Sequence, residues 1–250
     1  MNYWKQGIAA MVLACSAGTA AATDIIVSAA ASLTNAFTDI GKEFEKANSD
    51  YKVLFNFAGS GALLQQISRG APVDVFASAD QDTMDKAVAQ NLILRSSRAD
   101  FARNTLVLVS PAKGGVAIAD LNGLKDPGVT RIAISNPDTV PVGKYSKGAL
   151  EAAGLWDAVK DKSVNTQSVR QSLDYVARGE AGAGFVYKTD AAVMPDKVKV
   201  LFEVPTKTPI TYPIAVVKGN GKEKLAQSFV EFVKTASAQA ILAKYGFLKP

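Results

Sequence analysis

Four short segments lie where a predicted strand passes into a predicted helix. Ser32 and Ser60 stand at the first two of these junctions, and Val142 and Val169 stand at the other two. The first turn of a helix presents backbone N–H groups without intrahelical partners, together with the positive end of the helix dipole. These positions therefore predict a site for an anion, and Tyr187, which closes a further strand, could add a phenolic hydroxyl.

Each of these positions also has a purely structural explanation. A Ser at the mouth of a helix often serves as its N-cap, which contributes about 1 kcal/mol, and this explanation stays open for Ser32 and Ser60. Tyr187 would equally suit a core position in which its hydroxyl is hydrogen-bonded. Two Ser-bearing junctions in one part of the chain and two further junctions in another nevertheless favour a small anion held by neutral donors.

The composition argues against most enzymatic chemistry. The chain of 250 residues contains no His and one Cys, which removes His-based triads, His-ligated zinc and internal disulfides. Gly143-Lys144 is followed by Tyr instead of the Ser or Thr of a phosphate-binding loop, and Leu64 stands where a dinucleotide fingerprint beginning at Gly59 needs Gly. The sequence therefore predicts a binding protein without catalytic residues, cofactor or metal cation, and not an enzyme.

Strands and helices are predicted to alternate along the chain after residue 22. Apolar β-branched runs indicate strands, and apolar positions that recur every three to four residues indicate helices. Repeated strand–helix–strand units predict an α/β protein whose mainly parallel sheets carry helices on both faces. The predicted strands are 24–30, 52–58, 73–78, 105–110, 131–135, 182–187, 198–204 and 211–218, and the predicted helices are 33–48, 62–69, 81–91, 142–153, 169–178 and 222–245, the last with a break near Ser237.

Two of these strands are predicted to carry the chain between two lobes. They begin at Thr105 and Thr211, and each ends at a Gly-containing loop. The predicted first lobe comprises 23–104 and 214–250, and the second comprises 105–213. Ligands of open α/β sheets bind beyond the carboxyl ends of strands, so the anion is expected between the lobes. A single large sheet is the alternative.

Residues 1–22 have the features of a secretory signal peptide. A basic residue precedes a short apolar stretch, and the Ala run at 20–22 offers a cleavage site before Thr23. A lipid anchor on Cys15 is the less favoured alternative, because Leu13 fits a lipoprotein cleavage box poorly. The mature protein is therefore predicted to be exported to the periplasm.

The charge distribution does not predict a nucleic-acid partner. The net charge of +5 falls to +4 after removal of residues 1–22, which contain one Lys and no acidic residue. The basic residues are dispersed, without a run of five. A modest and dispersed charge of this kind is typical of a solvated surface.

Several segments resemble the periplasmic molybdate-binding proteins of ABC transporters, in the order in which that family carries them. The most specific are AAASLTNA at 29–36 and GAPVDVFASAD at 70–80, with FAGSGAL at 57–63 between them. Further matches follow at 136–145, 168–170, 184–187, 212–217 and 243–247. The resemblance covers essentially all of 23–250. It implies a two-lobed periplasmic-binding-protein fold of type II and an inner-membrane ABC permease as partner, and we further expect a monomer.

By this resemblance, the ligand is molybdate or the similarly sized tungstate. The residues implied to bind it are Ser32, Ser60 and Tyr187 through hydroxyls, and Ser32, Ser60, Val142 and Val169 through backbone N–H groups. Relatives often carry further Ser residues in the second loop, where this chain has Gly59 and Gly61. Another tetrahedral oxyanion, such as sulfate or thiosulfate, is the alternative ligand.

Overall fold

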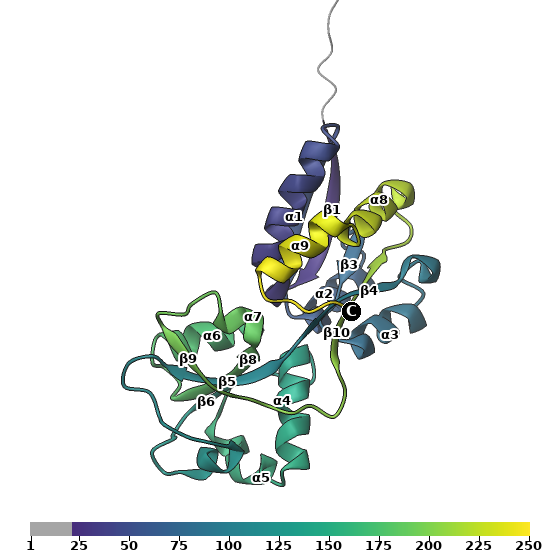
Figure 1. Cartoon of the computed structure of the whole chain (residues 1–250). Coiled ribbons are helices and arrows are strands. Elements are labelled where there is room, and N and C mark those ends of the chain that lie inside the picture. The colour runs from purple at the N-terminus through teal and green to yellow at the C-terminus, as the bar shows by residue number, and fades with distance from the viewer. Residues whose placement is uncertain (1–21) are drawn as a thin grey trace, which may run out of the picture.

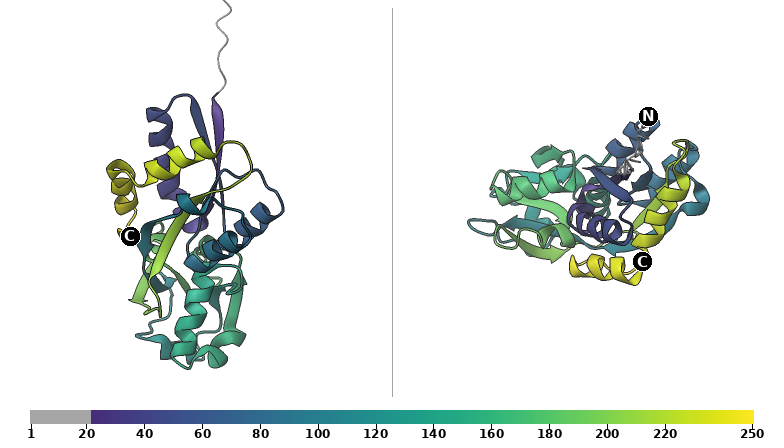
Figure 2. Two further views of the ribbon diagram at one scale, coloured as in Figure 1. Left: turned by 90° about the vertical axis from the view of Figure 1, so that its right-hand side faces the viewer. Right: turned by 90° about the horizontal axis from the view of Figure 1, so that it is seen from above.

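In the computed structural model, which describes residues 22–250, the chain forms two α/β lobes, each built on its own five-stranded sheet (Figure 1). The lobes stay distinct when the molecule is turned (Figure 2). A single large sheet, the alternative to two lobes, is therefore wrong. The predicted signal peptide and Cys15 lie outside the described residues, apart from Ala22.

The first sheet has the strand order β2-β1-β3-β10-β4. β1 pairs in parallel with β2 and β3, as strand–helix–strand units require, whereas β10 pairs antiparallel with β3 and β4. β10 is thus the one strand of this sheet that runs against the others. The strands are β1 Thr23–Ala30, β2 Tyr51–Ala58, β3 Val75–Ala77, β4 Ala99–Asn104 and β10 Ile210–Val216.

The second sheet repeats this pattern with the strand order β7-β6-β8-β5-β9. β6 pairs in parallel with β7 and β8, and β5 is the reversed strand between β8 and β9. The prediction of a mainly parallel sheet in each lobe is confirmed. The strands are β5 Leu106–Pro111, β6 Ile132–Ser135, β7 Ser163–Thr166, β8 Ala183–Tyr187 and β9 Val198–Glu203.

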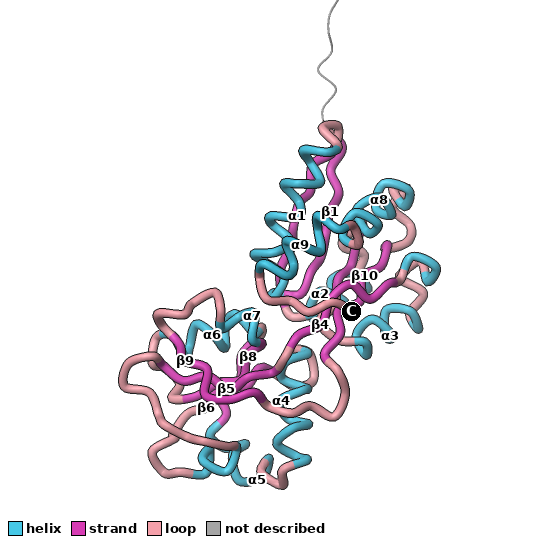
Figure 3. Tube along the Cα trace, viewed as in Figure 1, coloured by secondary structure: helices cyan, strands magenta, loops and turns pink. Residues whose placement is uncertain are grey.

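The chain passes between the two sheets twice. Thr105 alone separates β4 from β5, so the first passage is nearly continuous strand, whereas the second passage is the loop 204–209 between β9 and β10 (Figure 3). The ladder between β10 and β4 begins at Ile210. This pairing holds 210–213 in the first sheet, so the chain returns to that sheet a few residues before the boundary predicted at 213–214.

Each sheet carries helices on both faces (Figure 1). In the first lobe α1 packs with α8 and α9, and α2 packs with α3; in the second lobe α4 packs with α5, and α6 packs with α7. The helices are α1 Thr34–Ala47, α2 Ser60–Ser68, α3 Gln81–Ala89, α4 Pro141–Ala152, α5 Trp156–Val159, α6 Val169–Ala177, α7 Lys188–Ala191, α8 Glu223–Val233 and α9 Ala236–Lys244. Short 3-10 turns occupy Ala31–Leu33, Arg95–Ser97, Leu121–Lys125 and Lys160–Lys162.

Side-chain alternation along the strands explains why both faces need helices. In β3, Val75 and Ala77 belong to the main core, whereas Phe76 belongs to a second cluster with Leu63 of α2 and Met84 of α3. Successive residues of a strand point to opposite faces of the sheet. A central strand with apolar residues at every position therefore requires a packed layer on each side.

Two strands in the structure, β4 and β7, are not predicted from the sequence. Both are edge strands, and the polar residues in ADFARN and SVNT break up any apolar run. The predicted break near Ser237 is confirmed, because α9 begins at Ala236 with Thr235 as its N-cap. Within residues 22–250, no helix has both the length and the apolar character that a bilayer crossing requires.

Candidate anion-binding site

A small cavity lies between the two lobes, where strands pass into helices. It is lined by 30–32, 58–60 and Ala79 of the first lobe and by 140–142, Val169 and Tyr187 of the second. All the residues predicted for the site line this cavity: Ser32, Ser60, Val142, Val169 and Tyr187. The fold therefore joins segments that are distant in the sequence around one small cavity.

Four of the lining segments are first turns of helices. Ser32 lies in the 3-10 turn that leads into α1, Ser60 is the first residue of α2, Val142 is the second of α4, and Val169 is the first of α6. Backbone N–H groups at such positions have no carbonyl partner one turn earlier, and the helix dipole is positive there. The four positions thus offer backbone donors to an anion.

The start of α4 is positioned by the absence of a side chain at Gly143. A Cβ at this position would collide with the carbonyl oxygen of Ser135, the last residue of β6. Pro141 stands at the first helical position, where its missing N–H leaves no bond unmade. The sequence therefore brings the first turn of α4, with Val142, directly against the end of the strand.

Neither serine is a helix cap, so the structural explanation through N-caps is wrong. No side chain caps α2 or the 3-10 turn that precedes α1. Ser60 Oγ instead accepts the backbone N–H of Ala79 at 3.1 Å, and Ser32 Oγ lies 3.0 Å from Tyr212 Oη. A backbone N–H can only donate, so the hydroxyl proton of Ser60 remains for a ligand.

Tyr187 places an unpaired hydroxyl at the cavity. Its side chain is 1% exposed and its Oη has no hydrogen-bond partner among the described residues. The alternative, a core position in which this hydroxyl is hydrogen-bonded, is therefore wrong. A buried hydrogen bond that is left unmade costs about 1–3 kcal/mol. Burial raises the pKa of Tyr187 well above its ordinary value, so the hydroxyl stays protonated and remains a donor at neutral pH.

A cationic side chain joins the lobes beside the cavity without lining it. Arg170 of α6 donates to Asp190 Oδ1 at 2.6 Å, to Asn35 Oδ1 at 2.8 Å and to the Ser32 carbonyl at 3.4 Å. Burial outweighs the nearby guanidinium and raises the pKa of Asp190 to about 6. No charged side chain of the described chain lines the cavity itself, so the donors available to an ion are neutral.

The lobes also touch at the second loop. The N–H of Gly61 donates to the Thr139 carbonyl of the other lobe at 2.9 Å. A Cβ on Gly61 would lie 2.5 Å from that carbonyl oxygen, and a Cβ on Gly59 would lie 2.8 Å from the carbonyl oxygen of Gln167. The two glycines therefore allow a close approach of the lobes and add no hydroxyl to the site.

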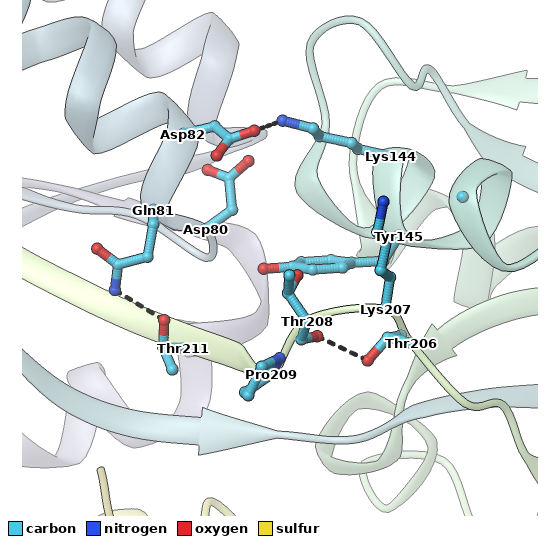
Figure 4. Close-up of a pocket in the computed structure, with 11 residues that line it drawn as sticks. Asp80, Gln81, Asp82, Lys144, Tyr145, Thr206, Lys207, Thr208, Pro209 and Thr211 are labelled. Atoms are coloured by element: carbon cyan, nitrogen blue, oxygen red, sulfur yellow. Dashed lines mark hydrogen bonds and ion pairs between the residues drawn. The ribbon is translucent and has the colours of Figure 1, made fainter.

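A wider cleft opens between the lobes near the cavity (Figure 4). Its lining includes Asp80 and Tyr145. Asp82 of α3 and Lys144 of α4 form an ion pair between the lobes at this cleft. None of the predicted binding residues lines it, so the smaller cavity is the better candidate for an anion.

Sequence analysis did not identify three polar residues around the cavity, Asn104, Tyr212 and Arg170. Tyr212 is hydrogen-bonded to Ser32, and Asn104 is hydrogen-bonded to Tyr212. Arg170 and Tyr212 lie in segments that carry the family resemblance, which is the one signal that could have drawn attention to them. Asn104 has no such signal, because its role depends on contacts with residues far away in the sequence.

Two lobes with a small cavity between them, lined by first turns of helices, are the architecture of a solute-binding protein. Residues 25–248 match the family of bacterial extracellular solute-binding proteins, and the chain belongs to this family. The chain is 39% identical to YvgL of Bacillus subtilis, named as a candidate ABC transporter substrate-binding lipoprotein, over 89% of this chain and 85% of that protein. It is 37% identical to the molybdate-binding protein ModA of Escherichia coli over 92% of each.

Solved structures agree with this assignment. The periplasmic molybdate-binding protein of Azotobacter vinelandii superimposes with a TM-score of 0.78 at 28% identity, covering 90% of this chain and 99% of that one. The sulfate-binding protein SubI of Mycobacterium tuberculosis superimposes with a TM-score of 0.80 at 17% identity, covering 90% and 86%. The second likeness shows the fold alone, so the fold does not distinguish one oxyanion from another.

Proposed function

We propose that this protein binds molybdate, or tungstate, between its lobes and delivers the ion to an ABC importer. The observation that carries the proposal is the buried Tyr187 hydroxyl, which has no hydrogen-bond partner within residues 22–250 and lies at a small cavity beside four first turns of helices. The molybdate-binding relatives from Escherichia coli and Azotobacter vinelandii support the identity of the ion. The proposed role is capture and transfer, without a catalytic step.

The proposed ligand set consists of neutral donors from both lobes. It comprises the hydroxyls of Ser32, Ser60 and Tyr187 and the backbone N–H groups of Ser32, Ser60, Val142 and Val169. Hydrogen bonds to a charged partner contribute about 1.5–3 kcal/mol each, so seven contribute roughly 10–20 kcal/mol. Association and ordering of the lobes offset several kcal/mol, which leaves roughly −8 to −12 kcal/mol, between micromolar and nanomolar affinity.

The donor set also bears on selectivity. Hydrogen phosphate carries an O–H that needs an acceptor, and a ring of donors supplies none. Sulfate accepts hydrogen bonds as molybdate does, but it is a smaller tetrahedron, so its bonds to the same donors would be stretched. Tungstate matches molybdate in charge and size, and we expect no discrimination against it.

Thermal unfolding with matched anion concentrations tests the proposed ligand. Molybdate and tungstate should each raise the Tm, since a ligand at 100 times its Kd stabilises the folded state by about 2.7 kcal/mol. Sulfate, thiosulfate and phosphate should have a much smaller effect. Equal shifts with sulfate and molybdate would favour the alternative sulfate-type ligand, and no shift with any anion would contradict the proposal.

Capture requires the lobes to move relative to each other. The proposed lobes are 23–104 with 210–250, and 105–209, which places the second boundary at the start of β10 and not at 213–214. The proposed hinge consists of the two passages, Thr105 and 204–209. Rotation about two neighbouring passages opens or closes a cleft without disturbing either sheet.

The proposed site of action is the periplasm, with a permease of the inner membrane as partner and a monomer as the binding unit. Membership of the extracellular solute-binding family supports export. The lipoprotein name of the Bacillus subtilis relative keeps an anchor on Cys15 as the alternative. Intact-mass analysis of the exported protein tests this, because a chain beginning at Thr23 excludes the anchor and a lipidated Cys15 establishes it.

A further inference from the structure

Three buried polar side chains form a continuous row that ends at the cavity. Ser32 Oγ lies 3.0 Å from Tyr212 Oη, and Tyr212 Oη lies 3.1 Å from Asn104 Nδ2. Asn104 is 8% exposed, Ser32 is 2% exposed and Tyr212 is fully buried. Asn104 is also the last residue before Thr105, where the chain passes between the sheets. The row therefore runs from this passage to one of the proposed ligands of the ion.

The backbone determines the direction of these hydrogen bonds. The N–H of Thr105 donates to Asn104 Oδ1 at 2.9 Å. Because a backbone N–H cannot accept, this bond identifies the amide oxygen, and the Nδ2 group must be the end that faces Tyr212. Nδ2 then donates to Tyr212 Oη, and its other hydrogen bond goes to Thr189 Oγ1 at 2.8 Å.

The direction continues to Ser32. A phenol has one proton, and since Tyr212 Oη already accepts from Asn104, that proton is directed to Ser32 Oγ. Ser32 Oγ therefore accepts from Tyr212 and makes no other hydrogen bond within the described chain. Its own proton is left to point into the cavity that it lines.

We propose that Asn104 and Tyr212 are positioning residues that preset the Ser32 hydroxyl as a donor toward the bound oxyanion, and so disfavour anions that carry a proton. This inference rests on the proposed function of the cavity. The Ala79 N–H presets Ser60 in the same way. With the Tyr187 hydroxyl, which has no partner in the described part of the chain, the cavity then presents three hydroxyl donors, and the O–H of hydrogen phosphate finds no acceptor among them.

Tyr212→Phe tests the role of the phenolic proton. The substitution keeps the ring, which packs edge-on against Phe247 and Tyr187 at centroid distances of 5.4 and 6.0 Å, and it frees Ser32 to rotate and accept. Calorimetric titration should show molybdate binding weakened about 3- to 10-fold. Phosphate should compete with molybdate more strongly than it does in the wild type.

A double-mutant cycle separates positioning from a merely structural role. In a Ser32→Ala background, Tyr212→Phe should cause no further loss of affinity, because the group through which Tyr212 acts is gone. Losses that add would overturn the proposal, and so would wild-type affinity and phosphate exclusion in Tyr212→Phe. Should Tyr212→Phe lower the Tm of the unliganded protein strongly, Asn104→Ala, which leaves the tyrosine intact, provides the same coupling test with Ser32→Ala.

Tyr245→Phe is the matched control. Its hydroxyl donates to Asp39 Oδ2 at 2.7 Å on the first lobe, and it does not line the cavity. Affinity and selectivity should therefore match the wild type. Failure of the wild type to bind molybdate at all would overturn the proposed function, whereas normal binding without coupling between Tyr212 and Ser32 would overturn this inference alone.

Discussion

Two buried serines make the same kind of hydrogen bond in different places. Ser60 Oγ accepts the Ala79 N–H at 3.1 Å beside the cavity, and Ser97 Oγ accepts the Val216 N–H at 2.8 Å in the first lobe. Ser97 also donates to the Leu94 carbonyl, whereas Ser60 keeps its proton available. Substituting Ser60 and Ser97 in turn therefore separates an effect on anion binding from an effect on stability.

Ser60→Ala should weaken molybdate binding by about 1.5–3 kcal/mol, or roughly 10- to 150-fold, because one charge-assisted hydrogen bond is lost. Ser97→Ala should leave affinity unchanged, although both substitutions leave a buried N–H unpaired and should lower the stability of the unliganded protein by about 1–3 kcal/mol. Calorimetric titration and thermal unfolding of both variants check this. Wild-type affinity in Ser60→Ala would remove that residue from the site.

The first turn of α2 both begins a helix and contacts the opposite lobe. Gly61 is the second residue of this helix, and its N–H bonds to Thr139 of the opposite lobe. Glycine is a poor helix former, less favourable than Ala by about 1 kcal/mol. Its presence here is explained by the approach of the other lobe, since a Cβ would lie 2.5 Å from a backbone oxygen that has little freedom to move.

Gly61→Ala should therefore reduce molybdate affinity by about 10-fold or more, corresponding to roughly 1.4 kcal/mol or more of hindered closure, while the stability of the unliganded protein stays equal or rises. Gly148→Ala is the control, because Gly148 lies within α4 and a Cβ there meets nothing within 4 Å. That variant should gain helix stability and bind normally. Unchanged affinity in Gly61→Ala would mean that the lobes do not close as tightly on the ion as this contact indicates.

In the proposed site, the ion is held by backbone dipoles and neutral hydroxyls and not by the net charge of the protein. The chain carries a net charge of +5, yet the cavity is lined within the described residues by neutral groups. Two ion pairs lie between or near the lobes, Asp82 with Lys144 and Arg170 with Asp190. Within each pair, the positive and the negative charge compensate each other. Oriented N–H groups at a small, largely buried cavity are screened less by salt than charges on the exposed surface are.

Molybdate affinity should therefore depend weakly on ionic strength. A rise from about 20 to about 200 mM of a salt with a non-competing anion should change the Kd by less than about threefold, since screening acts mainly on charges exposed to solvent. Calorimetric titration at several salt concentrations measures the dependence. A steep loss of affinity would indicate that a cationic side chain, such as Lys144 at the neighbouring cleft, contacts the ion.

Local pattern was sufficient to predict most of the central strands and the long helices. Hydrophobic periodicity reports which faces of an element are buried, and this holds for segments such as 24–30 and 169–178, which the structure places within about one residue of β1 and α6. The strand–helix junctions at Ser32, Ser60, Val142 and Val169 follow from the same alternation. In an α/β sheet, the carboxyl ends of parallel strands meet at one edge. This rule predicts that the residues at these junctions line one cavity.

Contacts between distant residues decided the rest. The serines look like N-caps in the sequence, and only the positions of Ala79 and Tyr212 show that their hydroxyls are not used as caps. The edge strands β4 and β7 and the return of the chain at β10 depend on pairing with strands elsewhere, and short polar segments do not encode such pairing locally. The direction of the hydrogen bonds from Asn104 to Ser32 likewise exists only in the folded chain, because it joins residues from two strands and a helical turn that burial has cut off from water.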